Sequence, residues 1–358
     1  MSQLTQTAHY ARKFIKFFLI GLIAIIILVP SVRAFKQYWQ ERHPNPPPPP
    51  NIAFGKIPPL NFGTQGYSEE KLSFQLQTAE GGLPNLGTQA RVYFITILDS
   101  KFFDEEKARQ KAAFLSFSQE LGKISTTRLA FNNPQTNATL KIDIINNNFE
   151  INYPYQNDPF FTNQPSPNQS QALKNVKNIL SQANLWHDDI DPQKTHFILL
   201  KYNQNAQNFI IAQSLSESEL VKVNLMRADL DNLPIMPPNP DESNISFIVS
   251  SQSGGQKAIF GKHVRYPINY KKWGTYPIKS SVTAWEEFRS GQGFIARLGN
   301  NSPKNPIMIR RIYLAYFDPE IPQSFLQPIF VFEGYNDFLG YLPAIDPSYL
   351  SETESSTN

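Results

Sequence analysis

The chain has 358 residues and a formal charge of +3, which is enough length for one large domain or two ordinary ones. The chain has 33 basic and 30 acidic residues. Residues 1–50 contain six of the basic residues and one of the acidic residues, so the rest of the chain is slightly acidic. A large domain without positive excess argues against a nucleic-acid-binding protein. The absence of cysteine excludes disulfides, thiolate metal sites and cysteine nucleophiles.

The first predicted element is a transmembrane signal anchor at residues 17–34, after a short cytoplasmic segment at 1–16. No charge lies between Lys16 and Arg33, and the apolar run would reach about 28 Å as a helix, close to the thickness of a bilayer core. Cleavage is the alternative, because Val32-Arg33-Ala34 loosely fits a signal-peptidase site. The length of the run and the arginine favour an uncleaved anchor. Long following domains translocate largely regardless of charge, so we expect a single-pass cell-membrane protein whose large domain is extracytoplasmic.

Residues 35–60 are predicted to be an interfacial segment and a proline-rich linker. Aromatic and basic residues from Phe35 to Trp39 are suited to a membrane interface. Five consecutive prolines, Pro46 to Pro50, favour an extended polyproline II spacer. A ligand for an SH3-type domain is the alternative interpretation of the same run.

Residues 61–215 form the first predicted α+β region. Alternating apolar residues predict a half-buried strand at 72–78, which we expect to pair with a second strand at 90–98. Asp104 is expected to cap a helix over 105–122, with Gly122 as its end. The later elements predicted here are strands 126–132 and 139–153, a helix at 169–183, and strands 196–202 and 208–212.

Residues 216–350 form the second predicted α+β region. It holds a hairpin of strands 245–250 and 257–260, a helix from Ser281 to Ser290, and strands 307–317, 326–334 and 339–344. The polar tail, residues 351–358, is predicted to be disordered. The predicted fold class is therefore α+β, with antiparallel sheets, helices packed on one face and repeated helix-strand-strand units.

Strand 307–317 is apolar on both faces, which predicts a central position in its sheet. Strict alternation places Ile309 and Tyr313 on one face, and Ile312 and Leu314 on the other.

The C-terminal region carries a family resemblance. Ala284-Trp-Glu-Glu-Phe-Arg-Ser-Gly-Gln-Gly-Phe-Ile295 is similar to the helix of PepSY-like domains, and Leu314–Phe317, Leu326–Gly334 and Tyr341–Ala344 resemble the strands that follow it. The arrangement also resembles the extracytoplasmic regions of the YycH and YycI proteins, which regulate a membrane sensor kinase. The resemblance covers residues 280–345. It implies a non-catalytic domain that associates with peptidases or regulatory partners.

If the resemblance holds, the helix at residues 281–290 packs across the C-terminal sheet. Trp285 and Phe288 are three positions apart and share one face of this helix. We therefore expect both rings to be buried against Leu314 or Val331.

Few residues could perform catalysis or bind a metal. The five histidines form no HExxH pair, and no Gly-x-Ser-x-Gly motif is present. Gly291-Gln292-Gly293 lacks the third glycine of a dinucleotide-binding fingerprint. His187-Asp188-Asp189 could form a metal or base cluster, but its place after a helix and before Pro192 is typical of capping or turn residues. We predict no catalytic residue, no cofactor and no metal site.

Three residues near the C-terminus form the predicted partner-binding site. Glu333 ends an apolar strand, so its carboxylate could bind a basic group of a partner, or it could accept hydrogen bonds from neighbouring backbone N–H groups. Tyr335 and Phe338 belong to an aromatic cluster that could present rings to a peptide or an envelope polymer. Packing in the protein core is the alternative interpretation of these rings.

Together these observations predict a membrane-anchored, non-enzymatic regulatory or protein-binding module of the cell envelope. Its expected partner is another envelope protein or a peptide. The alternative is an envelope-acting hydrolase, which would gather Asp188, Asp189, Glu333 and a histidine in one cleft. A purely structural spacer is the third possibility.

Overall fold

The computed structural model comprises two compact units, residues 1–49 and 50–358. It describes residues 16–19, 22, 25–36, 38–39, 48–63, 72–79, 81–96, 98, 103–155, 165–251 and 258–352. The start of the predicted proline run, the tip of the hairpin predicted near residue 254 and most of the predicted tail lie outside these residues.

The first unit corrects the prediction of a transmembrane helix. Its described residues between Lys16 and Trp39 are helical, and their side chains are exposed. Within the described part of the chain, no helix combines the length and the apolar character needed to cross a bilayer. The membrane-spanning helix included in the predicted fold class is therefore not shown.

The second unit corrects the predicted α+β class, because the chain is predominantly β. Its described strands form sheets of nine, six and three strands. The described α-helices of this unit are short: α2 (Asp104–Phe114), α3 (Gln169–Gln182) and α4 (Ser281–Glu287). Residues 216–280, at the start of the second predicted region, contribute strands of eight and ten residues to two of the sheets.

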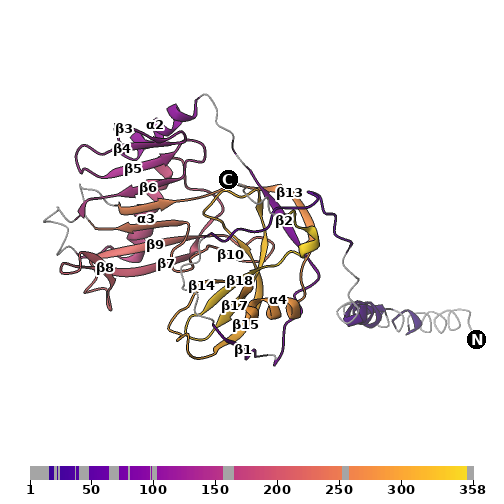
Figure 1. Cartoon of the computed structure of the whole chain (residues 1–358). Coiled ribbons are helices and arrows are strands. Elements are labelled where there is room, and N and C mark those ends of the chain that lie inside the picture. The colour runs from indigo at the N-terminus through magenta and orange to yellow at the C-terminus, as the bar shows by residue number, and fades with distance from the viewer. Residues whose placement is uncertain are drawn as a thin grey trace, which may run out of the picture. The chain divides into compact units, whose positions relative to one another are not determined.

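The nine-stranded sheet is antiparallel (Figure 1). Its order is β3 (Gln119–Ser125), β4 (Arg128–Asn132), β5 (Thr139–Asp143), β6 (Phe149–Asn152), β12 (Ala258–His263), β11 (Ile245–Val249), β9 (Leu220–Arg227), β7 (Ile190–Asn203) and β8 (Asn208–Ile211). The predicted hairpin of β11 and β12 is confirmed. Residues 215 and 216, the predicted region boundary, lie between β8 and β9 of this single sheet.

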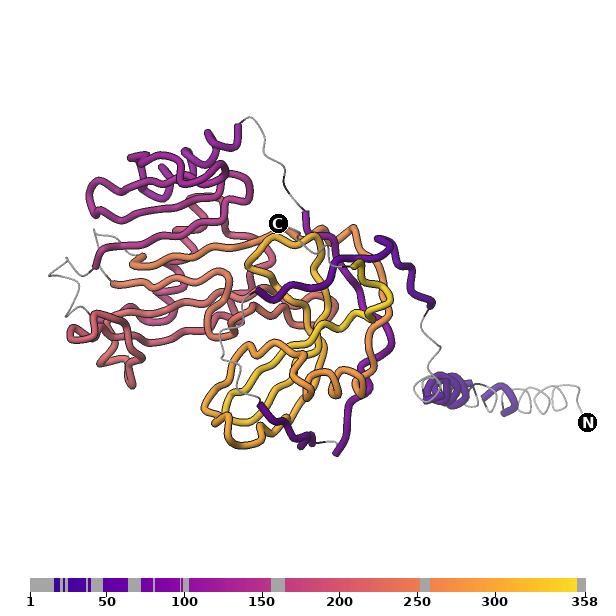
Figure 2. Tube along the Cα trace, in the orientation of Figure 1, coloured from indigo at the N-terminus to yellow at the C-terminus, as the bar shows by residue number. Residues whose placement is uncertain are grey.

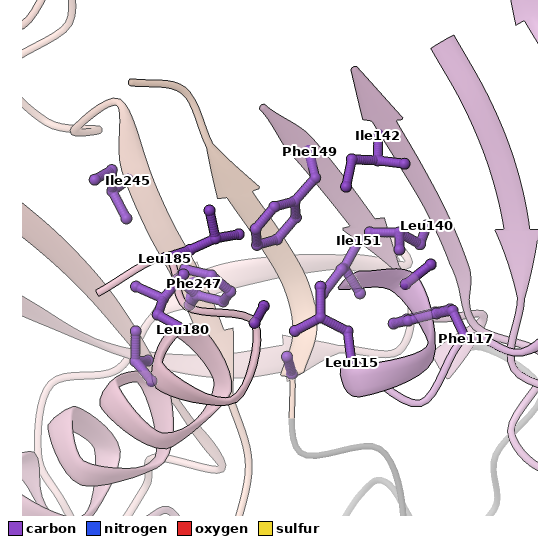
Figure 3. Close-up of a cluster of buried hydrophobic side chains, with 14 of the residues drawn as sticks. Leu115, Phe117, Leu140, Ile142, Phe149, Ile151, Leu180, Leu185, Ile245 and Phe247 are labelled. Carbon is purple, nitrogen blue, oxygen red and sulfur yellow. The ribbon is translucent and has the colours of Figure 1, made fainter. Parts of the chain in front are cut away.

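Both α2 and α3 pack on one face of the nine-stranded sheet. A capping box begins α3, because the Asn168 side chain accepts a hydrogen bond from Gln171 N at 2.9 Å and the Gln171 side chain accepts one from Asn168 N at 3.2 Å. Figure 3 shows Leu115 and Leu180 among the sheet residues Ile151 and Phe247, in the core beneath the helices.

Helix α2 is shorter than the helix predicted over 105–122. It ends at Phe114, and Ser116 adopts a left-handed backbone conformation with φ of 73°. The turn inserts the ring of Phe117, which is 1% exposed, into the core. The last residues of the predicted helix, from Gln119 onward, instead form the beginning of β3.

The six-stranded sheet lies in the C-terminal half. Its order is β1 (Phe74–Leu76), β15 (Ile307–Phe317), β17 (Pro328–Gly334), β18 (Leu339–Pro343) and β14 (Phe294–Arg297), and β10 (Ile235–Met236) also pairs with β15. The three-stranded sheet comprises β13 (Ile268–Pro277), β2 (Gln89–Ile95) and β16 (Phe325–Leu326). The predicted pairing of strands 72–78 and 90–98 is wrong, because β1 pairs in parallel with β15 while β2 pairs with β13 and β16.

A β-bulge in β15 alters the predicted facing of its residues. The register with β17 shifts between Ile309 and Arg311, so two arginines in succession are exposed. After the bulge Ile312 and Leu314 share the core of Ile309, whereas Tyr313 packs in the core of the opposite face.

The two expected anchors lie at the end of α4, Trp285 within the helix and Phe288 at the start of the π-helical turn that follows it, Phe288–Gln292. Trp285 is 8% exposed and Phe288 is 1% exposed, which confirms their burial. The ring of Phe288 stacks on Phe332, with centroids 4.0 Å apart. Leu314 belongs to the same core, as expected, but Val331 points into the core on the other face of the sheet.

Candidate functional site

The three predicted partner-binding residues occupy different environments. Phe338 is fully buried among aromatic residues, including Phe74 and Phe288. Glu333 forms ion pairs with Arg310 and with Arg311, the latter at 3.8 Å. Tyr335 is 48% exposed. Of the three, only Tyr335 therefore presents a largely exposed side chain to a partner.

The predicted acidic cluster after α3 proves to be part of a buried ion-pair network. Asp189 accepts hydrogen bonds from Arg227 at 2.6 Å and from two nitrogens of Arg265 at 3.1 Å. Arg227 also donates to Asp318 at 2.9 Å. Two carboxylates thus face two guanidinium groups, and the network joins β9 of the nine-stranded sheet to the end of β15 in the six-stranded sheet.

Burial and the arginine charges act in opposite directions on the two carboxyls of this network, and at Asp318 burial prevails and raises the pKa. Burial opposes ionisation of Asp189, but the charges of Arg227 and Arg265 outweigh burial and hold the pKa of the carboxyl below its usual range. Burial, with the positive charge of Arg265, lowers the pKa of His187 to about 4. At neutral pH the imidazole is uncharged and Asp189 is held by arginines, which is the arrangement of a structural network.

His263 is a second buried histidine in this region. It is 1% exposed, its ring stacks on Phe149 with centroids 5.2 Å apart, and no described residue hydrogen-bonds either ring nitrogen. Burial and the nearby His187 lower its pKa to about 3. Within the described ranges, no group of three His, Asp or Glu residues is placed to hold a metal ion.

A hollow in the second unit lies beside β14. A cavity of about 610 Å³ adjoins one of about 840 Å³, because the two share Asn61, Phe62, Gly63 and Phe294. We call these two cavities together the β14 groove. A smaller cavity of about 360 Å³ on the nine-stranded sheet shares Glu242 and Lys262 with the first one, which extends the hollow toward that sheet.

The β14 groove has an aromatic floor. Phe62 stacks on Phe294, with centroids 5.1 Å apart and planes 15° apart, and meets Phe317 edge-on at 4.9 Å. Tyr341 lies beneath these rings, and its hydroxyl donates to Pro237 O at 3.2 Å. Burial raises the pKa of Tyr341, so this phenol stays protonated. The floor can therefore accept a flat apolar group by ring stacking.

One wall of the groove is a free strand edge. β14 is the last strand in the order of its sheet and pairs with β18, and no other described strand pairs with it. Phe294, Ile295 and Ala296 of this strand line the cavity. An edge strand beside a hollow that is lined by both apolar and polar side chains is an arrangement that can bind an extended peptide by strand addition.

Most of the charges at the rim of the groove are paired. Asp241 pairs with Arg297 at 2.7 Å, Glu320 with Lys262 at 2.8 Å, and Glu242 with Lys222 at 3.3 Å. Among the described residues Glu352 is the rim carboxylate outside these pairs, so the rim carries little net charge and favours a segment without acidic side chains.

Sequence reasoning missed this groove. Phe294 lay just after the glycines of the predicted C-terminal helix, and Phe62 lay beside the linker. The aromatic and proline-rich composition around Phe62 was the available signal, but only the tertiary fold brings these two rings together.

The chain matches no protein-family model. No curated protein matches it either. Among solved structures it is similar to an uncharacterized protein from Eubacterium rectale, with a TM-score of 0.41 and 11% sequence identity, over 72% of this chain and 84% of that one.

Proposed function

We propose that this protein is a non-enzymatic protein-binding module that holds an extended segment of another protein in the β14 groove. The free edge of β14 beside the aromatic floor carries the proposal. Backbone hydrogen bonds along such an edge supply affinity, and side chains that enter the hollow supply selectivity. The predicted PepSY-like resemblance of residues 280–345 is compatible with this role, and the extracytoplasmic location remains a proposal based on the sequence of residues 1–50.

The hydrolase alternative is not adopted. That alternative required Asp188, Asp189 and Glu333 to share a cleft with a histidine. Asp189 is held by Arg227 and Arg265, whereas Glu333 is held by Arg310 and Arg311 on the six-stranded sheet. The two carboxylates thus serve separate ion pairs on different sheets.

Selection from a library of displayed twelve-residue peptides tests the proposal with the full-length protein. Ile321 lines the groove and is 40% exposed, so Ile321→Arg places a charge there at little cost to folding. Val282, 58% exposed on α4, is outside the groove and provides the matched control Val282→Arg.

We expect the selected peptides to lose at least tenfold in affinity for Ile321→Arg and to bind Val282→Arg like the wild type, as measured by calorimetry. Peptides that bind all three proteins equally, or a selection that yields no binder, would contradict the proposal.

A further inference from the structure

The segment that borders the β14 groove comes from far away in the sequence. Residues 58–63, which we call the strap, follow Ile57, whose backbone bridges to Leu350 near the C-terminus. Figure 2 shows this part of the chain running alongside the C-terminal strands. Leu60 and Phe62 of the strap pack against the core formed by the face of the six-stranded sheet opposite α4.

Phe62 is the point at which the two cavities of the groove meet. Its ring lines both the cavity of about 610 Å³ and the cavity of about 840 Å³. The ring stacks on Phe294 and meets Phe317 edge-on. Phe62, with its neighbours Asn61 and Gly63 and with Phe294, thus lies where the two cavities of the groove adjoin.

Side-chain amides hold the strap in place. Gln323 accepts a hydrogen bond from Asn61 N at 3.3 Å and donates to Asn61 O at 2.7 Å, while Gln327 donates to Pro58 O at 2.9 Å. No strand ladder in the described part of the chain includes the strap. Ile57, just before the strap, is fully buried, whereas Asn61 and Gly63 at its other end are exposed.

We propose that Phe62 is an internal occupant of the binding site, and that the partner of the groove is an extended apolar segment whose aromatic side chain displaces it. This inference deepens the proposed function and rests on it. The strap itself indicates what kind of segment the floor accepts. It is an extended segment with one aromatic ring between small or polar neighbours. The mostly paired rim charges fit a segment of this kind, which has no acidic side chain.

A tethered occupant weakens the binding of any competitor. A segment linked to its own site acts at an effective concentration on the order of millimolar. A partner that takes the place of Phe62 must overcome this competition, so removal of the ring should increase the affinity of the partner. A ring that serves only as core packing would have the opposite effect, because its loss would leave the floor less well ordered.

The test compares full-length wild type with Phe62→Ala in the same peptide selection. Phe54→Ala is the matched control, because Phe54 packs on Phe325 at 4.9 Å and does not line the groove. We expect the peptides selected on Phe62→Ala to be enriched in aromatic residues and to bind that variant at least tenfold more tightly than they bind the wild type or Phe54→Ala. A synthetic peptide Pro-Leu-Asn-Phe-Gly should compete with them, and its Phe-to-Ala analogue should not.

Gln323→Ala keeps the test decisive if Phe62→Ala fails to fold. This variant removes both hydrogen bonds to Asn61 without opening the core, and it should raise affinity for the same peptides severalfold. Peptides without aromatic enrichment, or with unchanged affinity for both strap variants, would overturn the inference while leaving the groove as a binding site. A selection that yields no binder on any of these proteins would overturn the proposed function itself.

Discussion

The nine-stranded sheet and the six-stranded sheet bury their residues in different patterns. Along β4 and β5, buried residues alternate with more exposed ones, and the helices α2 and α3 cover the buried side. Along β17 and β18, consecutive residues are buried, and separate cores lie on the two faces. A sheet with one covered face produces alternation, whereas a sheet covered on both faces produces an unbroken apolar run.

This difference locates the binding groove. The six-stranded sheet has few helices available to cover two apolar faces, and α4 covers one of them. The other face is covered by loops and by the strap, which leave the hollow beside β14. Apolar surface that is covered by loops is easier to expose to a partner than apolar surface that is covered by a packed helix.

The largest expected effect tests the helix-covered face of the six-stranded sheet. Phe288→Ala removes a ring that is 1% exposed and stacked on Phe332. We expect the free energy of unfolding to fall by about 3–5 kcal/mol in urea denaturation. Val282→Ala, on the exposed side of the same helix, should change it by no more than about 0.5 kcal/mol. Equal effects would mean that α4 does not anchor this face.

The next effect tests the connection between the two sheets. Arg227→Ala leaves Asp318 buried without its guanidinium partner, while Asp189 retains Arg265. We expect a loss of about 3 kcal/mol in the free energy of unfolding, at the lower end of the range for breaking a buried ion pair. The double variant Arg227→Met with Asp318→Leu should be more stable than Arg227→Ala. A double variant that is less stable would show that the charges themselves are required.

The next prediction concerns the pH dependence of stability that His263 of β12 gives to the nine-stranded sheet. The pKa of His263 is about 3 in the folded protein, compared with about 6.5 in an unfolded chain. The unfolded state therefore binds more protons, so the contribution of His263 is complete above about pH 6.5 and is lost as the pH falls toward 3.

His263→Phe should keep the stacking on Phe149 and remove this proton linkage. Between pH 7 and 4 we expect the variant to lose less stability than the wild type, by a difference on the order of 2–3 kcal/mol, measured by urea denaturation at each pH. Parallel pH profiles would contradict the assignment of this histidine as neutral in the fold.

The smallest effect tests the surface of the bulge in β15. Arg310, whose side chain is 51% exposed, pairs with Glu333. Because exposed ion pairs contribute little, Arg310→Ala should lower the free energy of unfolding by about 0–1 kcal/mol. A larger loss would indicate that this pair holds the bulge in register, and a matched Arg289→Ala, in the turn just after α4, would identify any general effect of charge removal.

Local patterns in the sequence predicted local structure and missed what depends on distant contacts. The helix α3 and the burial of Phe288 followed from helical spacing, because both depend on neighbouring residues. The pairing of β1 with β15 joins Phe74 to Ile307 and left no local signal. Helical spacing of apolar residues as far as Leu121 also predicted too great a length for α2. The helix ends at Phe114 because the ring of Phe117 packs into the core.

Sequence reasoning did not locate the candidate site, for the same reason. Tyr335 is exposed and Phe338 is sealed beneath Phe74, but neither residue lines the β14 groove. The groove is formed by Phe62 and Phe294. These residues are far apart in the sequence, and only the tertiary fold brings their rings together.

The order of the nine-stranded sheet also has a consequence for folding kinetics. One half comprises β3 to β6, and the other comprises β7, β8, β9, β11 and β12. Each half is formed largely by nearby strands, but the two meet where β6 pairs with β12, roughly a hundred residues later in the sequence. Loop closure of that length is slow compared with hairpin formation, so we expect each half to assemble first and this seam to close last. Gly261 in β12 lets the ring of Phe247 lie directly against the backbone, since a Cβ there would be 2.7 Å from that ring. Because Phe247 belongs to β11, the neighbour of β12 in the same half, any added side chain at this glycine should slow the assembly of that half before the seam closes.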